Sequence, residues 1–410
     1  MPHSETSPRY SWQTPAVILI CGCIIGMIGF GPRSALGLFL TPMSSLHGWG
    51  REIFSLALAI QMLMWGAAQP FVGAIADRFG PVSVLCAGAV LYALGLGWMA
   101  HATMPGELYL SAGFIVGVGL AGTSFTVVIG AFAKLLPLKW RSLAFGAGTA
   151  AGSFGQFLFS PLAAGLNSQF EWQTTLLIFA VIVMMIVPLS VTLAFGRDKP
   201  AHLSGQAAQQ SVGHALREAL GHRSYLLLVI GFFTCGFQLF FITVHLPSYL
   251  ADRGLPVQVG AWTIAAIGLF NIVGSLSSGW LSDRMPKRYL LAIIYALRSV
   301  AIYAFITLPV SPASSVIFGA VIGLLWLSTV PPTNGLVAVM FGTRWLTMLA
   351  GFAFFSHQVG GFLGVWLGGV LYDATGSYEM VWYGAILLGI LSGLVNLPIV
   401  EKPIARPAMA

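Results

Sequence analysis

Long apolar stretches alternate with short polar connections along the whole chain. Each stretch holds the roughly 20 apolar residues that a helix needs to cross a bilayer. Twelve of them lie near residues 15–40, 52–74, 82–101, 107–134, 141–166, 173–196, 223–250, 257–281, 289–308, 313–341, 345–371 and 379–399. Glycine makes up 49 of the 410 residues, and small residues let helices approach closely in lipid. We therefore predict an all-α integral membrane protein with twelve transmembrane helices.

One connection is longer and more polar than the others, and it divides the spans into two sets of six. Residues 197–222 contain Gln, Ser and His. We predict an N-terminal six-helix bundle over residues 1–196, a cytoplasmic linker over 197–222 and a C-terminal six-helix bundle over 223–410. The linker has no room for a soluble signalling domain, which disfavours a sensor or receptor.

Composition and charge exclude a soluble globule. Charged residues make up 8% of the chain and the mean hydropathy is +0.86, whereas soluble domains carry about 25% charged residues. The net charge of +7 would need a clustered basic patch to indicate nucleic-acid binding. With a cytoplasmic N-terminus, 15 of the 19 basic residues fall on the inner side. This distribution predicts a multi-pass protein of the inner (plasma) membrane with both termini in the cytoplasm.

A short motif follows both the second and the eighth span, with an offset of 206 residues. Glycine lets helices meet at the membrane surface, and aspartate can cap a helix end and pair with arginine. The motif consists of Gly73, Asp77 and Arg78 in the first half, and of Gly279, Asp283 and Arg284 in the second. We interpret these residues as an inner conformational latch in a duplicated transporter whose substrate site lies between the halves.

This arrangement resembles the major facilitator superfamily over essentially the whole chain. The resemblance implies two pseudo-symmetric six-helix bundles that work by alternating access. Three segments are also similar to the bacterial branch near monocarboxylate transporters and oxalate/formate antiporters, namely Gly31–Leu40, Val244–Tyr249 and Phe355–Gly361. The eighth span departs from that branch, because it contains Asn271 but no arginine where these relatives place a substrate-binding one. We therefore expect the anchor for the substrate elsewhere.

Charges inside the spans point to an anionic substrate. All twelve carboxylates fall in loops or at span ends, which disfavours a cationic substrate and a sodium or proton site built on a buried acid. Arg33 shares a helical face with several glycines and is our candidate anchor, because a guanidinium can hold a carboxylate through two hydrogen bonds. The alternative is that Arg33 reaches the outer headgroups or pairs with Glu52.

Further candidates lie on later spans. Arg298 is a second substrate-binding candidate, or a structural cation bonded to carbonyls of neighbouring helices. His357 is a candidate for substrate binding and proton coupling, since imidazole titrates near physiological pH; the alternative is a neutral tie between helices. His245 is a second proton-coupling candidate, or an interfacial residue. The other predicted substrate contacts are uncharged polar residues that could instead hold helices together: Gln61, Gln156, Asn271 and Asn334.

The fifth span has glycines at spacings of three and four residues between Gly146 and Gly155. Such spacing places several glycines on one helix face, where close packing is easiest. We predict that this glycine face forms the contact with the other half.

These observations predict a secondary active transporter of a small organic anion, a monocarboxylate, working by proton coupling or exchange. The alternative is a carrier of a larger neutral or weakly anionic metabolite, such as a vitamin or aromatic compound, because the 12% aromatic content offers stacking surfaces. An enzyme would need a catalytic constellation inside the spans. No GxxxxGK[ST] motif is present, so ATP coupling is not expected. We expect a monomer with no cofactor, metal or nucleic-acid partner.

Overall fold

The computed structural model describes residues 13–194, 212–342 and 346–404, and the regular structure within these ranges is helical. Eleven of its helical segments are long and apolar enough to cross a membrane. The remaining expected span, 141–166, falls within α8 (Leu138–Gln169), a continuous helix of 32 residues. The predicted all-α membrane fold is confirmed.

The segments of the first half, in order, are α1 (Pro15–Ser34), η1 (Leu36–Phe39), α2 (Leu40–His47), α3 (Arg51–Phe79), α4 (Pro81–Met99), α5 (Pro105–Leu108), the π-helical η2 (Tyr109–Ile115), α6 (Val116–Gly122), α7 (Phe125–Leu135), α8, α9 (Trp172–Met184), α10 (Ile186–Ser190) and η3 (Val191–Leu193). Those of the second half are α11 (Val212–Leu220), α12 (Arg223–Asp252), α13 (Val257–Ser282), α14 (Lys287–Thr307), α15 (Pro312–Leu325), α16 (Val330–Phe341), α17 (Leu346–Thr375) and α18 (Glu379–Asn396).

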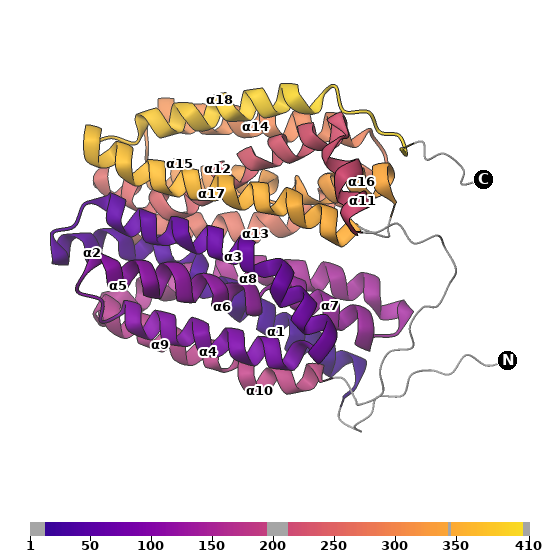
Figure 1. The fold of residues 1–410 in the computed structure, drawn as a ribbon. Helices are drawn as coiled ribbons and strands as arrows, with labels where there is room; N and C mark the ends of the chain where they lie inside the picture. The colour runs from indigo at the N-terminus through magenta and orange to yellow at the C-terminus, as the bar shows by residue number, and fades with distance from the viewer. Residues whose placement is uncertain (1–12, 195–211, 343–345, 405–410) are drawn as a thin grey trace, which may run out of the picture.

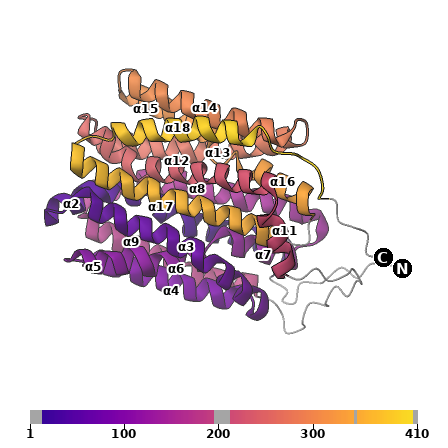
Figure 2. The same cartoon turned by 45° about the horizontal axis from the view of Figure 1, so that its top comes forward.

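The two halves lie side by side, with α1–α10 on one side and α12–α18 on the other (Figures 1 and 2). One buried hydrophobic cluster lies mainly in the first half and extends to a few residues of α12, α13 and α17, and a second cluster lies in the second half. The most extensive contacts between the halves are made by two helix pairs, α3 with α17 and α8 with α13, and α12 also contacts η1. The predicted boundary at 196 falls within residues 195–211, which lie outside the described ranges, and α12 begins at Arg223. The domain boundaries stay predictions. Helix α11 falls inside the predicted linker.

The helices end at two opposite faces, which we name by the elements found there. The α2 end contains α2 and the connections 48–50, 170–171, 253–256 and 376–378, and the α11 end contains α11 and the connections 136–137 and 283–286 (Figure 1). Helices α1, α12 and α17 run from the α11 end to the α2 end, and α3 runs the opposite way.

The tenth span is broken between α15 and α16. Pro331 and Pro332 lie in the first turn of α16, which begins at Val330, and there their missing N–H groups cost no helical hydrogen bond. The break leaves backbone groups that must find partners inside the membrane. Asn271 Oδ1 accepts the N–H of Leu327 at 2.9 Å, and the Ser278 hydroxyl donates to the carbonyl of Ser328. Side chains of α13 therefore supply hydrogen-bond partners for part of the backbone between α15 and α16.

Candidate functional site

The seam between the halves is crossed by side-chain amides. Gln156 Nε2 donates to the carbonyl of Ile264 at 3.2 Å, and Asn271 Nδ2 donates to Ser153 Oγ at 2.8 Å. Gln358 Nε2, on α17, donates to the carbonyl of Met62 on α3 at 3.3 Å. These hydrogen bonds join the two halves. In this conformation the three amide nitrogens are therefore already occupied and are not free to bind a substrate.

Helix α8 meets the other half, but not through its glycines. A Cβ at Gly155 would collide with the carbonyl of Met27 on α1, within the same half. The contact with α13 is made instead at Gly268, where a Cβ would lie 2.6 Å from the carbonyl oxygen of Ser153. The prediction that the glycine face of α8 contacts the other half was therefore wrong. Gly155 packs against α1 within the first half, and the close contact with α13 is made at Gly268.

Arg33 lies at the seam with its guanidinium surrounded by aromatic rings. Its Cζ is 4.4 Å from the ring centre of Phe240, 5.3 Å from that of Trp65 and 5.7 Å from that of Phe30. Nη2 contacts the Met62 sulfur at 2.8 Å, a weak acceptor. Nε has no hydrogen-bond partner. The rings belong to α1, α3 and α12, so both halves contribute to this surrounding.

The alternatives for Arg33 do not fit this geometry. The residue is 4% exposed, so it does not reach the headgroups. The ion pair that the structure records among the described side chains joins Arg51 to Asp252, not Arg33 to Glu52. Arg33 is therefore a buried cation whose described contacts are aromatic rings and a thioether.

His357 lies on α17 within a second group of rings and is 3% exposed. Its ring centre is 4.9 Å from Phe232, 5.3 Å from Phe240 and 5.7 Å from Phe354, to which it is nearly parallel. Nδ1 is 3.3 Å from Gln358 Oε1. Because the Phe240 ring also contacts Arg33, one side chain separates the two candidate site residues.

One nitrogen of His357 remains without a hydrogen bond. The Cys235 thiol approaches the imidazole, but Nε2 has no partner at hydrogen-bond geometry. Arg33 Nε is unpaired in the same sense. Buried polar groups normally have partners, so these two atoms on facing halves are our candidate contacts for a ligand.

Two other predicted substrate contacts, Gln61 and Asn334, form no hydrogen bond with Arg33 or His357. Gln61 Nε2 donates to the carbonyl of Ala112 at 2.8 Å, within the first half. Asn334 is exposed on α16, and no hydrogen bond connects it to Arg33 or His357. Gln61 thus has the helix-joining role that the sequence left open for it.

Arg298 is fully buried on α14 and bonded to backbone carbonyls. Its Nε and Nη2 donate to the carbonyl of Leu325 at 2.9 and 2.6 Å, and Nη2 also donates to that of Trp326. These carbonyls end α15, where a cation is favourably placed at the negative end of the helix dipole. These contacts fit the alternative that Arg298 is a structural cation bonded to carbonyls of a neighbouring helix.

His245 is also fully buried, so the interfacial alternative is wrong. Its Nε2 lies 2.8 Å from the carbonyl of Val365, and its Nδ1 lies 3.2 Å from the hydroxyl of Tyr378. A carbonyl only accepts, so Nε2 carries the proton in this arrangement. The same hydroxyl accepts a hydrogen bond from Arg51 Nη1 at 2.8 Å.

Arg51 belongs to a group of hydrogen bonds that join the two halves at the α2 end, which the sequence analysis did not predict. Its Nη1 and Nη2 donate to the two carboxylate oxygens of Asp252 at 2.7 and 2.6 Å, the two-bond geometry that is strongest for such pairs. Asp373 accepts the backbone N–H groups of Arg51 and Glu52 at 2.9 and 2.7 Å. We call Arg51, Asp252, Asp373 and Tyr378 the α2-end clamp.

The described residues of the repeated motif at the α11 end, namely Gly73, Gly279, Asp283 and Arg284, make no comparable contact across the seam. A Cβ at Gly73 or at Gly279 would have nothing within 4 Å. Asp283 and Arg284 are exposed, and Arg284 lies over the ring of Trp280, 3.7 Å from its centre. The side chains of Asp77 and Arg78 lie outside the described residues. The latch therefore stays a prediction.

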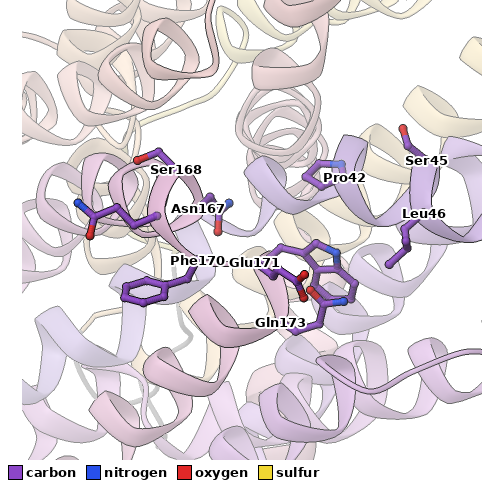
Figure 3. A pocket seen from close by; sticks show the side chains of 10 residues that line it. Pro42, Ser45, Leu46, Asn167, Ser168, Phe170, Glu171 and Gln173 are labelled. Atoms are coloured by element: carbon purple, nitrogen blue, oxygen red, sulfur yellow. The ribbon is translucent and has the colours of Figure 1, made fainter.

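Two cavities lie at the α2 end, away from Arg33 and His357. The larger, ≈720 Å³, is a groove between α2 and the connection from α8 to α9, where Asn167 and Gln173 face Pro42 (Figure 3). The smaller, ≈370 Å³, lies between the halves and is lined by residues of η1, α2, α8, α12 and α13. No group of three or more potential metal ligands occurs among the described residues.

Comparison with known proteins relates this chain to membrane transporters. The family described as Major Facilitator Superfamily matches residues 18–365. An uncharacterized MFS-type transporter, YcxA of Bacillus subtilis (strain 168), is 29% identical, and the match covers 98% of each chain. Monocarboxylate transporter 13 of Rattus norvegicus is 28% identical over 97% of this chain and 92% of its own. Monocarboxylate transporter 11 of Homo sapiens is 28% identical over 93% and 82%.

Solved structures agree on the fold. A D-xylose-proton symporter matches with a TM-score of 0.69 at 16% identity, over 96% of this chain and 98% of its own. A bacterial homolog of the human lysosomal transporter Spinster, in an inward-facing and occupied conformation, matches with a TM-score of 0.73 at 13% identity, over 94% and 97%. With two helical halves and a family match over most of its length, the chain belongs to the Major Facilitator Superfamily of membrane transporters.

Proposed function

We propose that this chain is a secondary active transporter of a small organic anion, a monocarboxylate, that works by alternating access with proton coupling or exchange. The observation that carries the proposal is Arg33, a buried guanidinium at the seam with an unpaired Nε and no described ion pair. A carboxylate would supply the missing partner through two charge-assisted hydrogen bonds. Two relatives named monocarboxylate transporters support the same class.

The proposed orientation places the α11 end in the cytoplasm, because most basic residues then lie inside. The α2-end clamp closes the outer side in this orientation, and the glycines of the repeated motif stand free on the inner side. The state described here is then the inward-facing one.

The proposal is tested by uptake of radiolabelled monocarboxylate into proteoliposomes. Losing one partner of a buried charge pair costs about 2–5 kcal/mol, so Arg33→Gln should lose nearly all saturable uptake. Arg33→Lys keeps the charge without the planar fork and should bind more weakly than wild type. The matched control is Arg253→Gln, which removes an exposed arginine at the α2 end. A folded Arg33→Gln protein with wild-type affinity would contradict the anchor.

His357 is the proposed site of proton coupling, since its Nε2 has no hydrogen-bond partner and the Phe240 ring contacts both His357 and the anchor. His357→Gln should flatten the pH dependence of net uptake, measured with and without a pH gradient. His245→Gln is the comparison, because His245 already bonds to Val365 and Tyr378. An unchanged pH profile in His357→Gln would remove this residue from the coupling mechanism.

A further inference from the structure

We propose that the monocarboxylate has an aromatic body, with its carboxylate at Arg33 and its ring among aromatic side chains of both halves. This inference rests on the proposed function and names the substrate class of the same site. It follows from the order of side chains along the helices that form the site.

Aromatic rings lie on the α11 side of the two buried polar groups. Phe30 precedes Arg33 by one turn on α1, and Phe354 precedes His357 by one turn on α17. Both helices run from the α11 end to the α2 end, so these rings lie nearer the α11 end. Phe30 and Phe354 are half-buried, whereas Arg33 and His357 are buried. A substrate entering from the α11 end therefore meets the rings before the cation.

Trp65 completes this ring surface from α3. Its ring lies edge to face with Phe354 of the other half, at 5.9 Å, and 5.3 Å from the guanidinium carbon of Arg33. The indole N–H already donates to Gln69 Oε1 at 3.1 Å. What Trp65 offers a ligand is therefore its apolar face, and both halves contribute to the surface.

The charges at the site match one carboxylate. Arg298 lies near the middle of its described span, and its guanidinium is bonded to carbonyls of the broken tenth span. A dicarboxylate would leave its second charge among rings, at a high desolvation cost. A short acid such as acetate would pair with Arg33 but leave the ring surface without a partner. An aryl acid satisfies both parts.

The experiment compares phenylacetate, acetate, succinate and the neutral phenylacetamide, with binding to purified protein measured by calorimetry. Phenylacetate should bind at least about tenfold more tightly than acetate, since aromatic contacts and buried ring area add to the charge pair. Trp65→Leu and Phe354→Leu should each reduce this ratio. Trp98→Leu, a change at an exposed ring on α4, is the matched control and should leave the ratio unchanged.

The outcomes separate this inference from the proposed function. If phenylacetate and acetate bind equally and both depend on Arg33, the aromatic class is wrong while the anion carrier stands. If phenylacetamide binds as tightly as phenylacetate, the carboxylate anchor fails as well. Tighter binding of succinate than of phenylacetate, or an unchanged ratio in Trp65→Leu and Phe354→Leu, would also overturn the inference.

Discussion

The α2 end and the α11 end of the seam are held in different ways. At the α2 end, Arg51 of the first half binds Asp252 and Tyr378 of the second through three hydrogen bonds of 2.6–2.8 Å. At the α11 end, the glycines of the repeated motif have open space where a side chain would begin. The α2 end thus relies on directional, charged hydrogen bonds, whereas the two described glycines of the motif at the α11 end have no neighbour within 4 Å.

This difference indicates which interactions decide the conformational equilibrium. Helix α3 begins after Gly50, which has no side chain to cap the helix. Asp373 of the other half takes the capping position, bonding the first N–H groups of α3. An anion at a helix N-terminus is favourable, and this one exists only while the α2 end is closed. Opening that end therefore costs a cap as well as an ion pair.

Removing the ion pair should have the largest effect. Hydrogen bonds to charged groups contribute about 2 kcal/mol, so Arg51→Gln should shift the population toward an open α2 end by about 30-fold. Distances between spin labels at positions 46 and 257, which are exposed on opposite halves, would measure the shift. The charge swap Arg51→Asp with Asp252→Arg should recover part of the closed state. No change in the distance distribution would remove the pair from the equilibrium.

Removing the cap supplied by the other half should have a smaller effect. Loss of a capping side chain typically costs about 1 kcal/mol, so Asp373→Ala should favour the open α2 end by about fivefold. Glu379→Ala changes a neighbouring carboxylate at the start of α18 and serves as the control. Equal distance distributions in Asp373→Ala and wild type would show that the cap contributes nothing to closure.

The repeated motif should show the smallest effect. Asp283 is exposed in this conformation, so Asp283→Asn should leave the clamped state and the substrate affinity unchanged. We expect a maximal transport rate lowered by about twofold, the size that an exposed ion pair supports. Uptake kinetics that separate maximal rate from apparent affinity would measure this. A wild-type rate, or a loss of binding, would contradict the latch.

The sequence predicted what depends on long local patterns and missed what depends on single distant residues. Apolar length located the spans, and intramembrane charge singled out Arg33. The pair of Arg51 and Asp252 joins positions 201 residues apart, and neither position belongs to a repeat. The break in the tenth span had a local signal in Pro331 and Pro332 that could have predicted it.

The carbonyl ligands of Arg298 have a consequence for how the chain enters the membrane. Alone in lipid, the ninth span would carry an unpaired arginine near its centre, at a cost of about 2.5–3.5 kcal/mol. Its partners at Leu325 and Trp326 belong to the following span, so they are absent until that span has been synthesised. We therefore expect the ninth span to enter the bilayer more favourably together with the tenth, as a hairpin, than alone.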